Sequence, residues 1–171
     1  MTVTNMDSSE ALFELSLLNA EKSDSSFEDF FVWGREKGIP IEVLTRLKAI
    51  WDFTKPIAGE IVSVGKIVVT AIADFLKANK EMMLGMAMGA AVAALVASVP
   101  FLGPLLAPLV TALSAIYGAG VGAALGDGEK TSDAANPMVA AITLAKKFME
   151  LLITIFQAVS AYWSDNEATT A

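Results

Sequence analysis

The feature that most constrains the fold is a long segment without any charged side chain, from Met82 to Gly126. It consists mainly of Ala, Gly, Val and Leu, and the sequence PFLGP at 100–104 divides it into two arms, 82–99 and 105–126. As α-helices these arms would be about 27 and 33 Å long, close to the roughly 30 Å of a bilayer hydrocarbon core. The segment therefore predicts a hydrophobic helical hairpin, which is either enclosed by the rest of the chain or inserted in a membrane.

Small residues recur at every fourth position in both arms, which places them on one face of each helix. Glycine inside a helix costs about 1 kcal/mol relative to alanine, so its repeated use indicates close helix packing, which matters most in lipid. The partner of this predicted packing seam is the other arm or a second copy of the chain. The seam consists of Gly85, Gly89, Ala93 and Ala97 in the first arm and Ser114, Gly118, Gly122 and Gly126 in the second. The predicted hairpin corner consists of Pro100, Gly103 and Pro104.

The segments on either side of the hairpin are amphipathic and predict helices. We expect short acidic helices within 1–54, a longer amphipathic helix at 57–79, a polar linker at 127–137 and a last amphipathic helix at 138–164. The alternation typical of β-strands is poor. At 171 residues the chain is long enough for one domain with a sizeable core. The sequence thus predicts a single all-α domain over 1–171, in which amphipathic helices wrap a central Ala/Gly-rich hairpin.

Helix-end signals are clear in the N-terminal third. Ser25 or Ser26 is expected to cap a helix that starts at Phe27, because a serine hydroxyl accepts hydrogen bonds from the first free N–H groups. Gly38 is expected to close that helix, and Pro40 to begin the next one.

Each long flanking helix carries one narrow polar stripe at helical spacing. A conducting pore needs such a stripe toward water and apolar groups toward lipid, so the stripes predict pore-lining positions; the alternative is that they are the solvent face of a bundle. The candidate pore-lining residues are Lys66, Thr70, Asp74, Lys147, Glu150, Thr154 and Gln157. Tyr162 and Trp163 would suit a membrane interface, and would equally suit the edge of a core.

Composition excludes several kinds of chemistry. The chain has no cysteine and no histidine, which excludes disulfides, thiolate nucleophiles, cysteine zinc sites and histidine general bases. We expect no enzyme activity, no cofactor and no metal. The net charge is −7 and no basic face is visible, which argues against a nucleic-acid partner. The first residues lack the basic start and apolar run of a secretory signal, so we expect synthesis in the cytosol without a Sec signal and action at or in a membrane, in the same cell or in a target cell.

The Ala/Gly/Val/Leu hairpin of Met82–Gly126, with its PFLGP corner, resembles the pore-forming domain of colicins. The resemblance is architectural and covers about a quarter of the chain. It implies that the hairpin inserts first, that amphipathic helices follow to form a channel, and that the producing cell holds an immunity protein. The chain is shorter than a colicin pore domain and lacks the receptor-binding and translocation regions of a colicin. It also resembles, more loosely, glycine-zipper toxins delivered by secretion machines, which need no signal peptide.

The first hypothesis for function is therefore a membrane-inserting, pore-forming protein, a bacterial toxin or effector that oligomerises through its glycine seam and depolarises a membrane. Its partners would be lipid and other copies of itself. The alternatives are a scaffold that polymerises or is anchored through the hairpin without conducting, and a soluble helical adaptor with the hairpin as its permanent core. A scaffold predicts oligomers without conductance, and an adaptor predicts a protein that ignores lipid.

Overall fold

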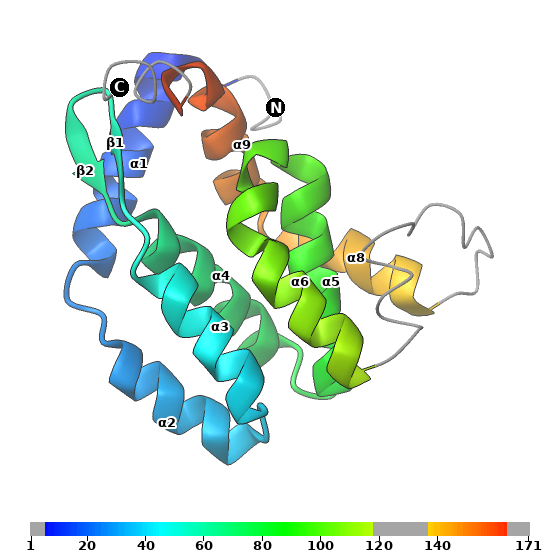
Figure 1. Ribbon diagram of the computed structural model, residues 1–171. Helices are drawn as coiled ribbons and strands as arrows, with labels where there is room; N and C mark the ends of the chain where they lie inside the picture. Colours follow the sequence, from blue (N-terminus) through cyan, green and yellow to red (C-terminus); the bar gives the residue numbers. More distant parts are fainter. Residues whose placement is uncertain (1–5, 118–136, 164–171) are drawn as a thin grey trace.

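A computed structural model describes residues 6–117 and 137–163, and the fold is all-α with one small β-hairpin (Figure 1). This confirms the fold class predicted from the sequence. The elements are α1 Ser8–Lys22, α2 Phe27–Lys37, α3 Ile41–Trp51, β1 Lys55–Ile57, β2 Glu60–Val62, α4 Val64–Ala78, α5 Leu84–Ser98, the 3₁₀ helix η2 Pro100–Leu102, α6 Gly103–Tyr117, α8 Pro137–Phe148 and α9 Glu150–Ala158.

The helix ends predicted around α2 are confirmed. The Ser26 hydroxyl accepts a hydrogen bond from the Glu28 N–H at 3.1 Å and caps the helix. Gly38 ends it in the left-handed conformation, with a φ of 92° that a residue with a Cβ rarely adopts. Pro40 directly precedes α3. The turn chemistry of this region is therefore sufficient to place both boundaries.

The predicted helix over 57–79 is wrong at its start, because a β-hairpin occupies its first residues. Lys55 pairs with Val62 and Ile57 with Glu60 across a two-residue turn, in which Ala58 and Gly59 have φ values of 52° and 88°. Positive φ at both positions matches the twist of a tight hairpin. The helix α4 begins only at Val64.

A side-chain clamp from α1 holds this β-hairpin in place. The Asn19 amide donates to the Ile61 carbonyl at 3.0 Å, and its oxygen accepts from the Ser63 N–H at 2.8 Å. The Ser16 hydroxyl donates to the Glu60 carboxylate at 3.0 Å. Glu60 and Ser63 therefore contact α1 rather than extending the polar stripe of α4.

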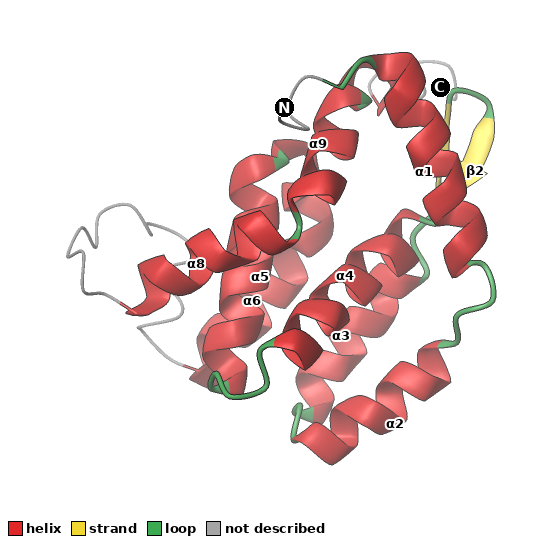
Figure 2. Ribbon diagram, turned by 180° about the vertical axis from the view of Figure 1, so that it is seen from behind, coloured by secondary structure: helices red, strands yellow, loops and turns green. Residues whose placement is uncertain are grey.

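The first arm of the hydrophobic hairpin is the central helix of the bundle. Helix α5 packs against α4, α6, α8 and α9, and Gly85 and 87–95 are buried. Helix α6 lies beside α5 and against α3 (Figures 1 and 2). We call the surrounding helices α3, α4, α8 and α9 the sheath. The predicted central hairpin and its amphipathic wrapping are thus present, with α5 more deeply enclosed than α6.

The predicted single C-terminal helix over 138–164 is also wrong, because it divides at Met149. Met149 has φ −102° and ψ 19°, outside helical geometry, and it separates α8 from α9. Helix α8 packs across α5, whereas α9 packs against α1 (Figure 2). Met149 itself is buried, so the change of direction is imposed by packing on two different neighbours rather than by a glycine or proline.

Of the predicted linker over 127–137, only Pro137 lies within the described residues, and it begins α8.

Candidate functional site

The candidate site is the hairpin of α5 and α6, because no described residue in it is charged. In the part of the chain that the structure describes, one helical span is long and apolar enough to cross a membrane, Pro100–Tyr117, with 18 residues and a mean hydropathy of 1.5. Only 28% of this span is buried. Helix α5, at 15 residues, would be about 22 Å long and shorter than a roughly 30 Å hydrocarbon core.

The exposed side of α6 is uncharged. Its inner side buries Leu106, Leu109, Ala112 and Leu113 against α5 and α3. Its outer side exposes Pro104, Ala107, Pro108, Thr111 and Ala115 to water. A surface helix of a soluble protein typically carries charged residues on this side. Helix α6 therefore presents to water a face that would also be compatible with lipid.

The predicted glycine seam lies partly within the hairpin. A Cβ added to Gly85 would lie 2.5 Å from the Tyr117 ring of α6, so the absence of a side chain at Gly85 makes room for that ring. Gly89 and Ala93 are buried, Ser114 is half-buried, and Ala97 is exposed at the far end of α5. Within the first arm, the seam therefore contacts α6 at Gly85, whereas Ala97 at its other end is exposed. Gly118, Gly122 and Gly126 lie outside the described residues.

Aromatic packing holds the hairpin corner, and the sequence did not reveal it. Pro100 opens the 3₁₀ helix η2 and Gly103 begins α6, with Pro104 exposed in the first turn. Between them, the Phe101 ring stacks on Trp163 with their centroids 4.3 Å apart. Phe101 also meets the edge of Phe156 at 6.1 Å.

Trp163 is thus placed in a cluster with the hairpin corner. Its ring also lies 6.1 Å from Phe53, and the Lys55 ammonium lies 4.9 Å from its centroid. Tyr162 is half-buried beside it. The membrane-interface role predicted for this pair stays a prediction. The spacing of Phe156 and Trp163, two helical turns apart, is the sequence signal that could have indicated a shared aromatic face.

A hydrogen bond joins the end of α5 to the sheath. The Gln157 side-chain amide donates to the Ser98 carbonyl at 2.8 Å, satisfying one of the carbonyls that a helix leaves free at its C-terminus. Thr154, one turn earlier, is buried at 3% exposure. Lys147 and Glu150 are exposed on either side of the break at Met149. The four C-terminal candidates therefore do not share one polar face in this state.

The candidates on α4 lie at the surface, close to α1. The Lys66 ammonium donates to the Ser23 carbonyl at 3.2 Å and lies 5.8 Å from the Trp51 centroid. The Thr70 hydroxyl donates to the Lys66 carbonyl at 2.8 Å. Asp74 is exposed and, with Thr70, borders a groove of about 270 Å³ whose apolar wall includes Phe148.

Among the described residues, no ion pair joins the polar stripe of α4 to the polar stripe of α8 and α9. Among residues 6–117 and 137–163, the single ion pair is Lys48–Asp52, at 2.9 Å on the surface of α3. The stripes therefore lie mainly on the outside of the bundle, with Thr154 as the buried exception.

These features define a helical bundle built around an uncharged helical hairpin. Comparison with protein-family models, with curated proteins and with solved structures found no match for this chain. The described residues also contain no group of acidic side chains arranged to hold a metal ion.

Proposed function

We propose that this protein stores the α5–α6 hairpin in a helical bundle and releases it into a lipid bilayer, where several copies form a pore that depolarises the membrane. The observation that carries the proposal is the absence of charge from the whole hairpin, including the water-exposed side of α6. Charged side chains are the costliest groups to place in a bilayer, and helices satisfy their backbone hydrogen bonds internally there. The hairpin therefore meets the two main requirements for insertion.

The contacts of the hairpin divide into two groups, which supports its movement as a unit. The close approach of Gly85 to Tyr117 joins α5 to α6 and would be kept on insertion. The Phe101–Trp163 stack and the Gln157–Ser98 hydrogen bond join the hairpin to the C-terminal part of the chain. These contacts would break on insertion, so they are expected to control it.

In the inserted state the amphipathic α4, α8 and α9 would supply the polar wall of the pore. Lys66, Thr70 and Asp74 share one side of α4, and Lys147 and Glu150 are exposed on α8 and α9. Burial of Thr154 means that α9 must rotate away from the core before this residue can face water. Lipid and further copies of the chain are the partners that this proposal requires.

A second candidate function is favoured by the burial of the middle of α5. A helix whose residues 87–95 are all enclosed is what a soluble adaptor with a permanent apolar core would have. Such an adaptor would neither bind vesicles nor release their contents.

A reversible cross-link tests the proposal. The chain has no cysteine, so Ser98→Cys with Gln157→Cys can be joined by a short, reducible bis-maleimide, tying the end of α5 to α9. We expect the cross-linked protein to bind vesicles but to release little trapped dye, and reduction to restore release. The uncross-linked double variant should release dye at least as fast as the wild type, because the Gln157–Ser98 hydrogen bond is lost.

The matched control joins two elements outside the hairpin. Ser16→Cys with Glu60→Cys places a link between α1 and β2, where the native side chains are 3.0 Å apart. This link should leave dye release unchanged. Equal release from all cross-linked and free forms would contradict hairpin release, and no release by the wild type would favour the adaptor.

A further inference from the structure

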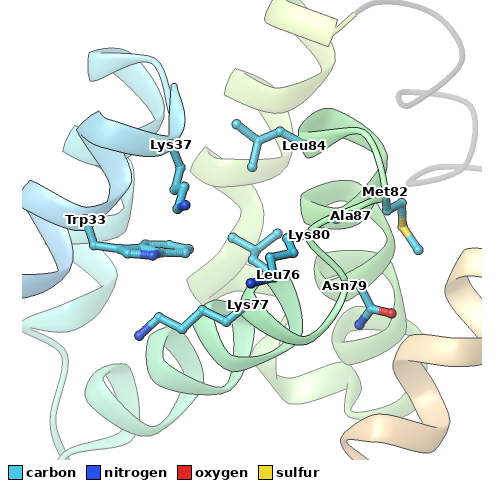
Figure 3. A pocket seen from close by; sticks show the side chains of 9 residues that line it. All are labelled: Trp33, Lys37, Leu76, Lys77, Asn79, Lys80, Met82, Leu84 and Ala87. Atoms are coloured by element: carbon cyan, nitrogen blue, oxygen red, sulfur yellow. The ribbon is translucent and has the colours of Figure 1, made fainter.

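A pocket of about 260 Å³ opens where α2, α4 and α5 meet (Figure 3). Trp33 and Lys37 reach it from α2, Lys77 from the last turn of α4, and Lys80 from the turn after α4. Its apolar lining includes Leu76, Leu84 and Ala87. It combines an apolar surface with three ammonium groups, in a chain whose net charge is −7.

The three ammonium groups have no acidic partner in the described structure. No carboxylate lines the pocket among the described residues, and the ion pair of the described chain, Lys48–Asp52, lies elsewhere on α3. Lys77 lies 5.1 Å from the Trp33 centroid, so the indole face helps to hold it. Figure 3 shows Lys37 and Lys80 extending toward the space beside the same indole. Three positive charges around one pocket, without a counter-charge on its described lining, favour binding of an anion.

The helix ends at the pocket add to this preference. Helix α5 begins at Leu84 and has no side-chain cap, so the positive end of its dipole and its free N–H groups lie at the pocket that Leu84 lines. The apolar lining is formed by side chains that water does not solvate well. An inorganic anion alone would neutralise the lysine charges but would leave the apolar lining exposed to water.

We propose that the pocket binds an anionic head group attached to an apolar chain. The head group would contact Lys37, Lys77 and Lys80, and the first part of the chain would lie along Trp33, Leu84 and the surface of Ala87. Pockets that enclose drug-sized ligands measure about 300–1,000 Å³, so this smaller one holds the head group and the chain start only. The ligand is a phospholipid in a bilayer or a free single-chain amphiphile.

Isothermal titration with decyl phosphate, below its micelle concentration, tests the binding. We expect saturable binding of one molecule per chain, and binding at least tenfold weaker for inorganic phosphate and for decanol. The triple variant Lys37→Gln, Lys77→Gln, Lys80→Gln should bind decyl phosphate at least tenfold more weakly. All three side chains are exposed, so the fold should be kept, which circular dichroism would verify.

A charge-matched variant separates this site from general electrostatics. Arg46→Gln, Lys48→Gln, Lys146→Gln removes three exposed positive charges away from the pocket and should leave decyl phosphate binding within twofold of the wild type. Trp33→Leu, which removes the indole but no charge, should also weaken binding. Equal losses in the two triple variants, or phosphate binding as tightly as decyl phosphate, would overturn the proposal, as would the absence of saturable binding.

Vesicles of phosphatidylglycerol and phosphatidylcholine distinguish the two sources of the ligand. If the pocket variant floats with these vesicles less than the charge-matched variant, the ligand is a bilayer lipid. If the two variants float equally while only decyl phosphate binding is lost, it is a free amphiphile. Decyl phosphate binding requires no bilayer, so its outcome does not depend on whether the hairpin inserts.

Discussion

At Gly65 the start of α4 lies so close to the end of α3 that adding one methyl group tests the packing of the two helices. A Cβ added to Gly65 would lie 1.6 Å from the Ile50 carbonyl oxygen, 2.7 Å from the Ile50 carbonyl carbon and 2.8 Å from the Trp51 oxygen. Since all three neighbours are backbone atoms, no side chain can rotate to make room. The Gly65 N–H also donates to the Phe53 carbonyl at 3.0 Å, which fixes this crossing.

The magnitude follows from the displacement that Gly65→Ala would require. A carbon–oxygen contact needs about 3.3 Å, so α4 must move away from α3 by roughly 1.7 Å. Overpacking of a well-packed core typically costs about 1–3 kcal/mol, and a displaced backbone belongs at the upper end. The gain in helix propensity, at most about 1 kcal/mol, offsets part of it. We expect a net loss of about 2 kcal/mol and a melting temperature lower by about 4–8 °C for a chain of this size.

Thermal and urea denaturation followed by circular dichroism measures this loss, with Gly103→Ala as the matched control. A Cβ added to Gly103 meets nothing within 4 Å, and its backbone is already helical. That variant should be neutral or slightly more stable. Equal stabilities of the Gly65 and Gly103 variants would refute the packing described for α3 and α4.

Further measurements test other parts of the structure. Gly85→Ala should cost about 1 kcal/mol, and Tyr117→Leu should remove most of that cost in a double-mutant cycle, because the three atoms nearest to the added methyl all belong to the Tyr117 ring. Ile57→Ala should cost about 2–5 kcal/mol and Ile61→Ala less than about 0.5 kcal/mol, since Ile57 is buried and Ile61 is 61% exposed; equal costs would contradict the register of the β-hairpin. Phe101→Ala should cost about 2 kcal/mol and speed dye release by freeing the corner from Trp163. Decyl phosphate at a hundredfold excess over its Kd should add about 2.7 kcal/mol of stability, measured as a rise in melting temperature.

The parts of the fold that follow from local sequence were predictable. The Ser26 cap, the Gly38 helix end and the proline-marked corner at 100–104 all depend on neighbouring residues alone. The uncharged hairpin was predictable because composition over many residues outweighs any single contact.

The features that depend on distant contacts were not predictable. The segment from Ile57 to Val62 fits a helical pattern as well as a hairpin, and Asn19 on α1 favours the hairpin by bonding to Ile61 in its second strand and to Ser63 directly after it. The break at Met149 has no glycine or proline to mark it, because two different packing partners impose it. The lysine pocket joins Lys37 of α2 to Lys80 in the turn after α4, and only the folded chain brings them together.

The measurement that tests hairpin insertion most directly compares two labelled positions in the presence of vesicles. Ala107 lies on the exposed side of α6 and Ala49 is exposed on α3, so a cysteine at either one can carry an environment-sensitive fluorophore without disturbing the core. With quenchers attached to lipid chains, insertion predicts strong quenching at position 107 and little at 49. Unquenched fluorescence at both positions, from protein shown to be bound to the vesicles, would contradict insertion of the hairpin.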